Sequence, residues 1–364
     1  MPDGSSTGIG VSVKRKEDYR FLVGEGNYTD DINRPNQTYS YMLRSSSAHA
    51  KFTVDTSNAS KSNGVVKIFV GSDMDVGSIP CGWQVDSKDG TPMREPAHPP
   101  IAKDKVRYVG EILAVVIADT LDDAKNAAEL IEVNYEDIPV IMNMKDAVDS
   151  SNGLVHEEIE SNICYDWEIG DSDAVDKAMA EAAHVTSLDI RNNRLIPNAM
   201  ETRAAIGDYE HATGQYTLYT TSQNPHVIRL LMGAFVLGLP EHKLRVIAPD
   251  VGGGFGSKIN VYNEEIVCSW ASKKIERPIK WVAERTESFL TDTHGRDHVT
   301  HAELAVTKDG KFLGFKNETI ANLGAYARVF GTVTPTYLFG PCATGVCVIP
   351  AAYSNVKAVY TNTA

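Results

Sequence analysis

The chain has 364 residues, and its 48 acidic residues outnumber its 35 Lys and Arg residues, which gives a formal net charge of −13 at pH 7. This charge argues against a nucleic-acid-binding protein and against docking on an anionic membrane, because both partners attract basic surfaces. Hydrophobic residues make up 42% and charged residues 23%, as in ordinary globular proteins, and a chain of this length is expected to form two domains.

The N-terminal part of the sequence alternates between predicted strands and one predicted helix. Residues 1–17 are expected to form a polar arm, without the apolar stretch of a secretory signal. A helix is predicted over 120–131, because Thr120 is a suitable N-cap, acids fill the first turn and apolar residues recur at three- and four-residue spacing. Strands are predicted at 38–46, 65–71, 105–119 and 131–141, with a long Pro- and Gly-rich loop at 72–100. This pattern predicts an α+β unit over 18–145.

The remainder, 146–364, is predicted to be a second unit of mixed strands and helices. Its early segment 150–162 is polar and rich in turn residues, and we interpret it as a linker. The last residues, 355–364, are expected to form a strand that stops without a turn, as if the polypeptide continued. Helices are predicted over 171–183, 224–238 and 259–275, strands over 184–193, 204–210, 215–222, 243–250 and 277–284, and a hairpin with a KDGK turn over 298–326.

Neither a membrane span nor a disulfide framework is expected. No run of 18 apolar residues occurs, so the sequence predicts a soluble, cytoplasmic protein with no membrane partner. The five cysteines are scattered and contain no Cys-x-x-Cys motif, which argues against an iron–sulfur site in this chain. We interpret Cys342 and Cys347 as buried thiols in a reducing compartment.

The most distinctive local motif is a glycine-rich loop, GGGFGSK at 252–258, between a predicted strand and a predicted helix. Glycines allow backbone N–H groups to approach a ligand closely, and the N-terminus of a helix favours an anion. The spacing fits neither a Walker A loop nor the G-x-G-x-x-G motif, since Ser257 stands at the third glycine position. The loop is therefore predicted to bind an anion or a cofactor, with Phe255 as a pocket wall; the alternative is a tight strand-to-helix turn.

Three further polar motifs could carry chemistry. The segment TSQNPH at 221–226 lies where a strand passes into a helix, and Gln223 offers both a donor and an acceptor; the alternative is a helix cap. Glu201 and Arg203 could be catalytic or could form a structural ion pair. His294 and His298 have a metal-ligand spacing, but a zinc site needs a third ligand, and a surface polar network is the simpler interpretation.

These motifs occur in the same order in one known family. Together they resemble the large molybdenum-binding subunit of the xanthine dehydrogenase and aldehyde oxidase family, and within it the branch of aerobic carbon monoxide dehydrogenase large subunits and related hydroxylases. The resemblance runs from about residue 14 to the end of the chain. It is carried by RKEDYRFLVGEGNYTDDI, KVRYVGEILAVVIAD, IPNAMETRAAI, TSQNPHVIRLLMGAFVLGLP, VIAPDVGGGFGSK, RPIKWVAERTESF, THGRDH and ANLGAY.

The resemblance implies a fold and a cofactor. It implies an α/β hammerhead domain over about 18–145 and the first part of a molybdopterin-binding domain, with mixed sheets and helices, over 146–364. The cofactor implied is molybdopterin with molybdenum, in bacteria often as the cytosine dinucleotide, lying between two large subdomains of such proteins.

The resemblance also implies site residues. Gln223 matches the family's glutamine that hydrogen-bonds an oxygen ligand of molybdenum, and it is the one catalytic candidate in this chain. Gly254, Phe255 and Gly256 match the loop whose backbone approaches the same centre, and Gly253 is expected to contact the cofactor beside them. No residue of this chain is expected to ligate the metal directly.

The activity implied is oxidation or hydroxylation of a small molecule, namely an aldehyde, an N-heterocycle or carbon monoxide, with water as the oxygen source. Electrons would pass to iron–sulfur clusters and FAD on partner chains of a multi-subunit complex. The family's catalytic glutamate and the cysteine of the carbon monoxide branch would follow Ala364, so the remaining half of the large subunit is also an expected partner. Ile259 replaces a glutamate of the purine-oxidising members, which argues against a purine substrate.

Two other functions remain open from the sequence. The chain could be a non-catalytic cofactor-binding or scaffold module that retains the glycine loop, or an ordinary enzyme that binds a nucleotide there. If the leading hypothesis is correct, the chain is inactive alone, as part of a longer polypeptide or as one piece of a naturally split subunit.

Overall fold

The computed structural model describes residues 8–364 of the chain. Seven residues of the predicted N-terminal arm, 1–7, lie outside the described residues. The remainder of that arm is largely exposed and precedes the first helix, α1 (Asp18–Leu22). Within the described part of the chain, no helix is both long enough and apolar enough to cross a membrane.

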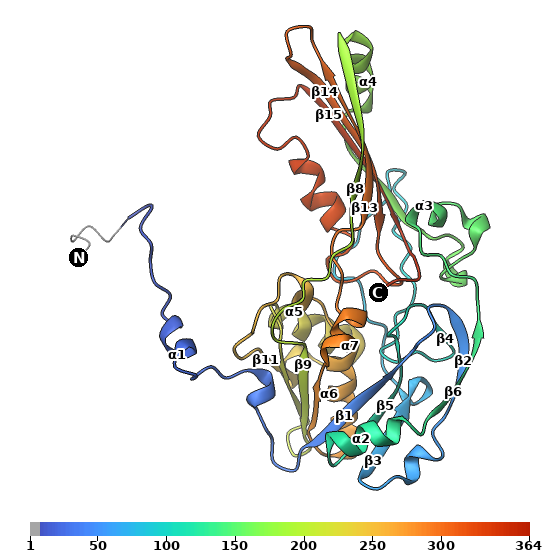
Figure 1. Ribbon diagram of the computed structural model, residues 1–364, viewed down its shortest axis with the longest axis vertical. Coiled ribbons are helices and arrows are strands. Elements are labelled where there is room, and N and C mark those ends of the chain that lie inside the picture. Colours follow the sequence, from blue (N-terminus) through green and yellow to red (C-terminus); the bar gives the residue numbers. More distant parts are fainter. Residues whose placement is uncertain (1–7) are drawn as a thin grey trace.

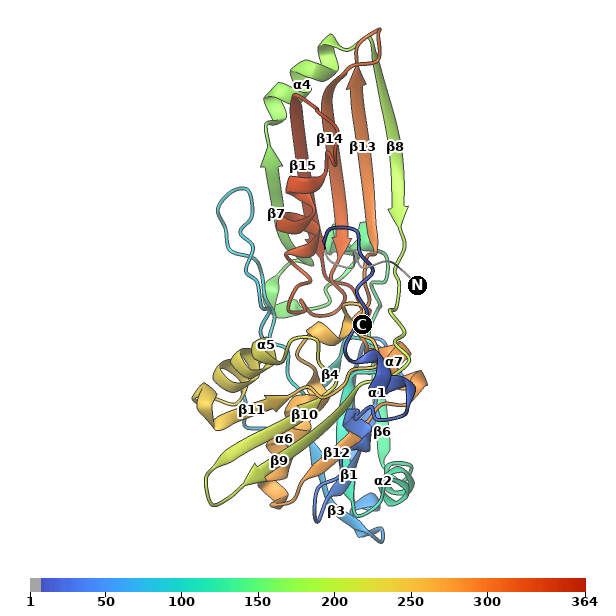
Figure 2. The same ribbon diagram turned by 90° about the vertical axis from the view of Figure 1, so that its left-hand side faces the viewer.

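The fold is a mixed α/β arrangement of two lobes built around three sheets (Figure 1). A seven-stranded sheet forms the centre of one lobe, and a five-stranded sheet forms the other. The C-terminus lies at the junction between them in both views (Figures 1 and 2). This junction matters for function because the glycine-rich loop also faces it.

The seven-stranded sheet combines strands from both predicted units. Its order is β11 (Leu244–Ile247), β10 (Gln215–Thr220), β9 (Ala204–Glu210), β12 (Ile279–Val282), β1 (Thr38–Arg44), β5 (Ile112–Ala118) and β3 (Val65–Val70). β1 and β12 pair in parallel, with Thr38 opposite Ile279. Strands before and after residue 145 therefore share one sheet, and the division of the chain at that residue stays a prediction.

β5 shows why this sheet is buried on both faces. All seven of its residues are buried, and successive side chains point to opposite faces of the sheet, with the two-residue period of a strand. Val115 and Ile117 face the main core, whereas Ala114, Val116 and Ala118 face the helix α2 (Leu121–Ala128). The Thr120 side chain caps this helix by accepting the Asp123 N–H, so the predicted N-cap is confirmed.

Helix α6 (Asn263–Ile275) covers the other face and lies very close to β9. A Cβ at Gly207 would stand 2.3 Å from the carbonyl carbon of Cys268, so only glycine permits this approach. The predicted helix over 259–275 begins later than expected, because a separate 3-10 turn, Ser257–Ile259, precedes it. The predicted helix over 224–238 is divided into α5 (Pro225–Leu230) and a π-helix, Leu231–Val236.

The second lobe is the five-stranded sheet, with α4 (Ser172–Glu181) packed along it (Figure 2). The predicted hairpin is confirmed: β13 and β14 pair antiparallel around the KDGK turn. The predicted last strand was displaced, since it starts earlier and ends at Val359, after which the Tyr360 N–H bonds to the Asn162 carbonyl. The order of this sheet is β7 (Ile163–Gly170), β15 (Ala351–Val359), β14 (Phe312–Asn322), β13 (His298–Val306) and β8 (His184–Asn192).

The segment predicted as a linker is an integral part of the fold. Val155, His156 and Asn162 are fully buried, and the Asn162 side chain joins the Val155 N–H to the Gly153 carbonyl. The reason is that its polar side chains satisfy the backbone of the turns they belong to, so polarity here does not mean exposure.

Other elements complete the chain. A small sheet consists of β4 (Lys105–Val106), β2 (Ala50–Asp55) and β6 (Glu132–Asp137), and the remaining α-helices are α3 (Met144–Ala147) and α7 (Arg285–Thr291). Short 3-10 helices occur at Thr29–Asp31, Ala59–Lys61, Gly71–Asp73, Ser150–Asn152, Glu157–Ile159, Glu241–Lys243 and Gly340–Cys342, and a second π-helix at Thr334–Leu338. The burial predicted for Cys342 and Cys347 is wrong: both thiols are exposed, because the segment around them lies on the surface of the second lobe.

Candidate cofactor-binding site

The glycine-rich loop leaves a row of backbone donors unused. It connects β11 to the 3-10 turn before α6, and Gly253, Phe255 and Gly256 have φ values of +95°, +50° and +95°. The N–H groups of Gly253, Gly254 and Phe255 donate to no acceptor within residues 8–364. Successive N–H groups in such a conformation form a concave site for an anion or a polarised oxygen.

Gln223 lies directly against this loop. The side-chain Oε1 of Gln223 accepts the Gly256 N–H at 3.0 Å, and the backbone N–H of Gln223 donates to the Lys258 carbonyl at 2.8 Å. A Cβ on Gly254 would stand 2.3 Å from Gln223 Cδ. The side chain is exposed, and its Nε2 has no acceptor in the described part of the chain. The carboxamide therefore offers its N–H donors to whatever occupies the loop.

A buried ion pair holds the base of the loop. Lys258 Nζ lies 2.9 Å from both Glu201 Oε2 and the Glu201 carbonyl, and the Gly252 N–H donates to the same Oε2 at 2.7 Å. Burial lowers the pKa of Lys258, although the hydrogen bond to Glu201 opposes that shift. The contact between Glu201 and Lys258 was not predicted, because the sequence places the acid in one motif and the lysine in another, and Glu201 was considered only beside Arg203.

Arg203 is engaged elsewhere. Its guanidinium donates to Glu264 Oε2 at 2.7 Å and to Asp292 Oδ1 at 2.6 Å, and lies 3.7 Å from the centre of the Tyr262 ring. Arg44 reaches Glu264 Oε1 at 2.5 Å from the other side. These groups form a structural network in the core next to the loop, so Arg203 is not a site residue.

The pKa values of the two adjacent carboxylates on α6, Glu264 and Glu265, are shifted in opposite directions. Burial disfavours ionisation of Glu264, but the charges of Arg203 and Arg44 outweigh it and lower its pKa far below the usual range. Burial raises the pKa of Glu265 to about 7, because only the Thr220 hydroxyl and the Tyr262 N–H bond to that carboxyl group.

We expect Glu265→Gln to stabilise the protein at alkaline pH. The raised pKa means that the folded protein binds this proton more tightly than the unfolded chain, so its stabilisation is complete below pH 4.5 and is lost as pH rises through 7. The loss amounts to about 3 kcal/mol, and glutamine imitates the protonated form at every pH. Urea unfolding at pH 5 and pH 8 measures the effect. A difference between variant and wild type that is equal at both pH values would contradict the prediction.

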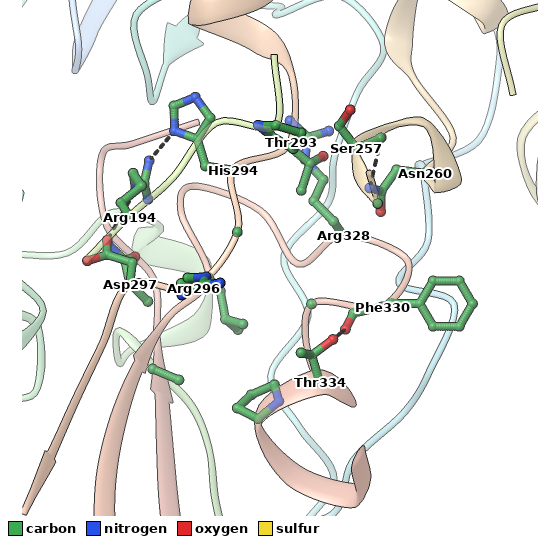
Figure 3. A pocket seen from close by; sticks show the side chains of 18 of the residues that line it. Arg194, Ser257, Asn260, Thr293, His294, Arg296, Asp297, Arg328, Phe330 and Thr334 are labelled. Atoms are coloured by element: carbon green, nitrogen blue, oxygen red, sulfur yellow. Dashed lines mark hydrogen bonds and ion pairs between the residues drawn. The ribbon is translucent and has the colours of Figure 1, made fainter. Parts of the chain in front are cut away.

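A cavity of about 250 Å³ adjoins the loop at the junction of the lobes (Figure 3). Phe255, which is 74% exposed, and Gly256 form one wall. Across it lie the loop that carries His294, the start of β13 at His298 and the segment that follows β14. Phe255 thus lines a cavity next to the loop amides, as its position in the motif predicted.

The candidate metal ligands His294 and His298 do not form a metal site with their neighbours. Arg194 Nη1 lies 3.2 Å from His294 Nδ1, and the Phe289 carbonyl lies 3.2 Å from its Nε2. Burial lowers the pKa of both histidines. Within residues 8–364 no group of three or more His, Cys, Asp or Glu side chains is arranged to bind a metal ion. His294 belongs to a polar network with Arg194, whereas the His298 side chain forms no hydrogen bond within the described residues.

The loop fits a large polar cofactor rather than a directly bound metal. Three adjacent amides and one carboxamide supply donors, and the absence of a Cβ at Gly254 keeps Gln223 in place beside them. A Cβ at Gly256 would meet nothing within 4 Å, so this side of the loop is open. These donors are suited to an oxygen-rich ligand.

Comparison with known proteins also indicates a cofactor-binding protein. Residues 155–364 match the molybdopterin cofactor-binding domain, and residues 23–139 match the a/b hammerhead domain of aldehyde oxidase and xanthine dehydrogenase. The chain therefore belongs to the xanthine dehydrogenase and aldehyde oxidase family of molybdopterin-binding oxidoreductases, whose members are dehydrogenases and hydroxylases.

Individual relatives cover nearly the whole chain. It is 34% identical to the carbon monoxide dehydrogenase large chain of Afipia carboxidovorans, over 98% of this chain and 45% of that protein. It is 32% identical to the nicotine 6-hydroxylase large subunit of Paenarthrobacter nicotinovorans, over 97% of this chain and 43% of that protein. Quinoline 2-oxidoreductase from Pseudomonas putida 86 superposes with a TM-score of 0.90 at 30% identity, over 97% and 44%. The chain spans less than half the length of these relatives.

Proposed function

We propose that this chain is the cofactor-binding part of the large subunit of an enzyme that oxidises or hydroxylates a small molecule, with oxygen supplied by water. The substrate would be an aldehyde, an N-heterocycle or carbon monoxide, and electrons would leave through iron–sulfur clusters and FAD on partner chains. The remaining half of the subunit would supply the catalytic glutamate. The observation that carries the proposal is the row of unused amides at Gly253, Gly254 and Phe255 beside the free Nε2 of Gln223.

Each of these groups has a defined task. The loop amides would donate to oxygens at the rim of the cofactor, and Gln223 Nε2 would donate to an oxygen near its metal. The Lys258–Glu201 pair keeps the loop in shape, and Phe255 limits the space beside it. When bound, the molybdenum cofactor, in the cytosine dinucleotide form, supplies the redox chemistry, while the protein supplies position and electrostatics.

Metal and pterin analysis of the assembled complex tests the proposal. One molybdenum and one pterin for each large subunit are expected, together with turnover of at least one of the three substrate classes. Molybdenum without any turnover would instead support a non-catalytic module. Absence of molybdenum from a complex matured in a host that makes the cofactor would refute the proposal.

We expect Gln223→Glu to reduce turnover about tenfold or more while leaving molybdenum content near that of the wild type. The carboxylate can still accept the Gly256 N–H, but it replaces the donating NH₂ with an acceptor, which removes a hydrogen bond worth about 1.5 kcal/mol or more. Steady-state kinetics on metal-normalised enzyme measures the effect. Gln215→Ala is the control, because that β10 side chain forms no hydrogen bond within the described residues. Unchanged turnover of Gln223→Glu would exclude the donor role.

A further inference from the structure

Arg328 is a buried arginine whose side chain contacts no carboxylate in the described part of the chain. Its side chain is only 8% exposed, forms no ion pair or hydrogen bond with residues 8–364, and leaves Nη1 buried without a partner. Arg203 and Arg44, which are equally buried, each contact carboxylates at 2.7 Å or less. Removing a guanidinium from water without pairing it is costly, so such a group is expected to meet an anion supplied from elsewhere.

The position of Arg328 shows where this anion would come from. Arg328 lines the same cavity as Phe255 and the glycine-rich loop, and Figure 3 shows its side chain extending toward Thr293 and Ser257. The Asp297 carboxylate on the cavity wall is already used, since it accepts from Arg194 at 3.1 Å and from Asn322 at 2.8 Å.

Among the described residues, no neighbouring carboxylate contacts the guanidinium. His98 is stacked on Tyr326 at 4.0 Å, and burial together with the charge of Arg328 lowers its pKa well below the usual value, so it stays neutral. The Glu111 carboxylate accepts from the Tyr326 hydroxyl and from the Arg107 backbone N–H; burial raises its pKa, and the charges of Arg107 and Arg328 oppose that shift without a direct contact to Arg328. Arg328 therefore keeps its hydrogen-bonding capacity for a group that enters the cavity it lines.

We propose that Arg328 binds a carboxylate group of the substrate, and that the substrate is an N-heteroaromatic acid or an aromatic aldehyde that carries a carboxylate. A planar guanidinium can bind both oxygens of a carboxylate at once, and Phe255, Leu323 and Pro335 give the cavity an apolar lining for a ring. In this arrangement the acid group would lie on the side of the cavity near Thr293 and Ser257, and the ring would occupy the rest of the cavity beside Phe255. This inference rests on the proposed function and narrows its substrate class.

The test uses the assembled complex and two isosteric probes, benzoate and benzamide, in isothermal titration calorimetry. Benzoate is expected to bind at least tenfold more tightly than benzamide. Arg328→Met is expected to abolish that preference without weakening benzamide binding, and Arg328→Lys to restore it only in part. Arg245→Met is the matched control, because Arg245 is exposed on β11 and forms no ion pair in the described chain.

Three outcomes would overturn the inference. The first is equal affinity of the wild type for the two probes. The second is loss of molybdenum or pterin from Arg328→Met, since the guanidinium would then pair with the cofactor. The third is a lower melting temperature of the Arg328→Met complex, since a protein carboxylate would then be its partner; removal of an unpaired charge should leave the temperature equal or higher. A complex without molybdenum that still prefers benzoate would refute the proposed function alone.

Discussion

Replacement of Gly254 by valine is expected to yield a folded large subunit that contains less than a tenth of the wild-type molybdenum. The added Cβ would stand 2.3 Å from both Cδ and Oε1 of Gln223, closer than any real contact. Gln223 would have to leave the loop and give up its bond to Gly256. The branched side chain would then also fill the space in front of the unused amides.

Metal analysis and a melting curve on the purified complex check this prediction. Gly233→Ala provides the control, because a Cβ there would make only an ordinary contact, 3.7 Å from Leu244 Cδ2. The control is expected to retain its molybdenum. Normal metal content in Gly254→Val would mean that the cofactor does not approach this loop, and the site assignment would be wrong.

The second large effect is expected from Arg203→Met, which should reduce the free energy of unfolding by about 3–5 kcal/mol. The methionine can occupy the space over Tyr262, but Asp292 would lose its cation and Glu264 would keep only Arg44. A buried carboxylate without a partner is much more costly than the complete network.

Urea unfolding followed by tryptophan fluorescence measures this change, since the Trp281 ring lies 5.2 Å from the Arg203 guanidinium. Arg285→Met is the control: that half-buried arginine contacts no carboxylate in the described chain and donates only to Asn198 Oδ1 and the Met200 carbonyl, so its loss should cost about 1 kcal/mol or less. An equal decrease in the free energy of unfolding in the two variants would show that the buried Arg203 network does not stabilise the protein more than the contacts of Arg285 do.

The sequence predicted those elements whose cap, turn and apolar spacing all lie within one short segment of the chain. The helix at 120–131 has its cap and its apolar spacing inside one segment, and the hairpin at 298–326 has its turn between two strand patterns. Helix α7 was not predicted, because its capping box lies within ERTE at 284–287 and directly follows a predicted strand. The π-helix that follows α5 was also not predicted, because the i to i+5 hydrogen bonds of a π-helix have no recognisable residue pattern in the sequence.

The sequence by itself determined the glycine-rich loop, the glutamine motif and the family, because these depend on residue types at short, fixed spacing. Only the tertiary structure decided their chemistry. Glu201 lies 57 residues from its partner Lys258, and Arg203 lies 61 and 89 residues from Glu264 and Asp292. The sequence does not show which acidic residue forms an ion pair with which basic residue. That depends on how two lobes and a shared sheet bring strand ends together, and the same packing leaves Arg328 facing the cavity without a carboxylate.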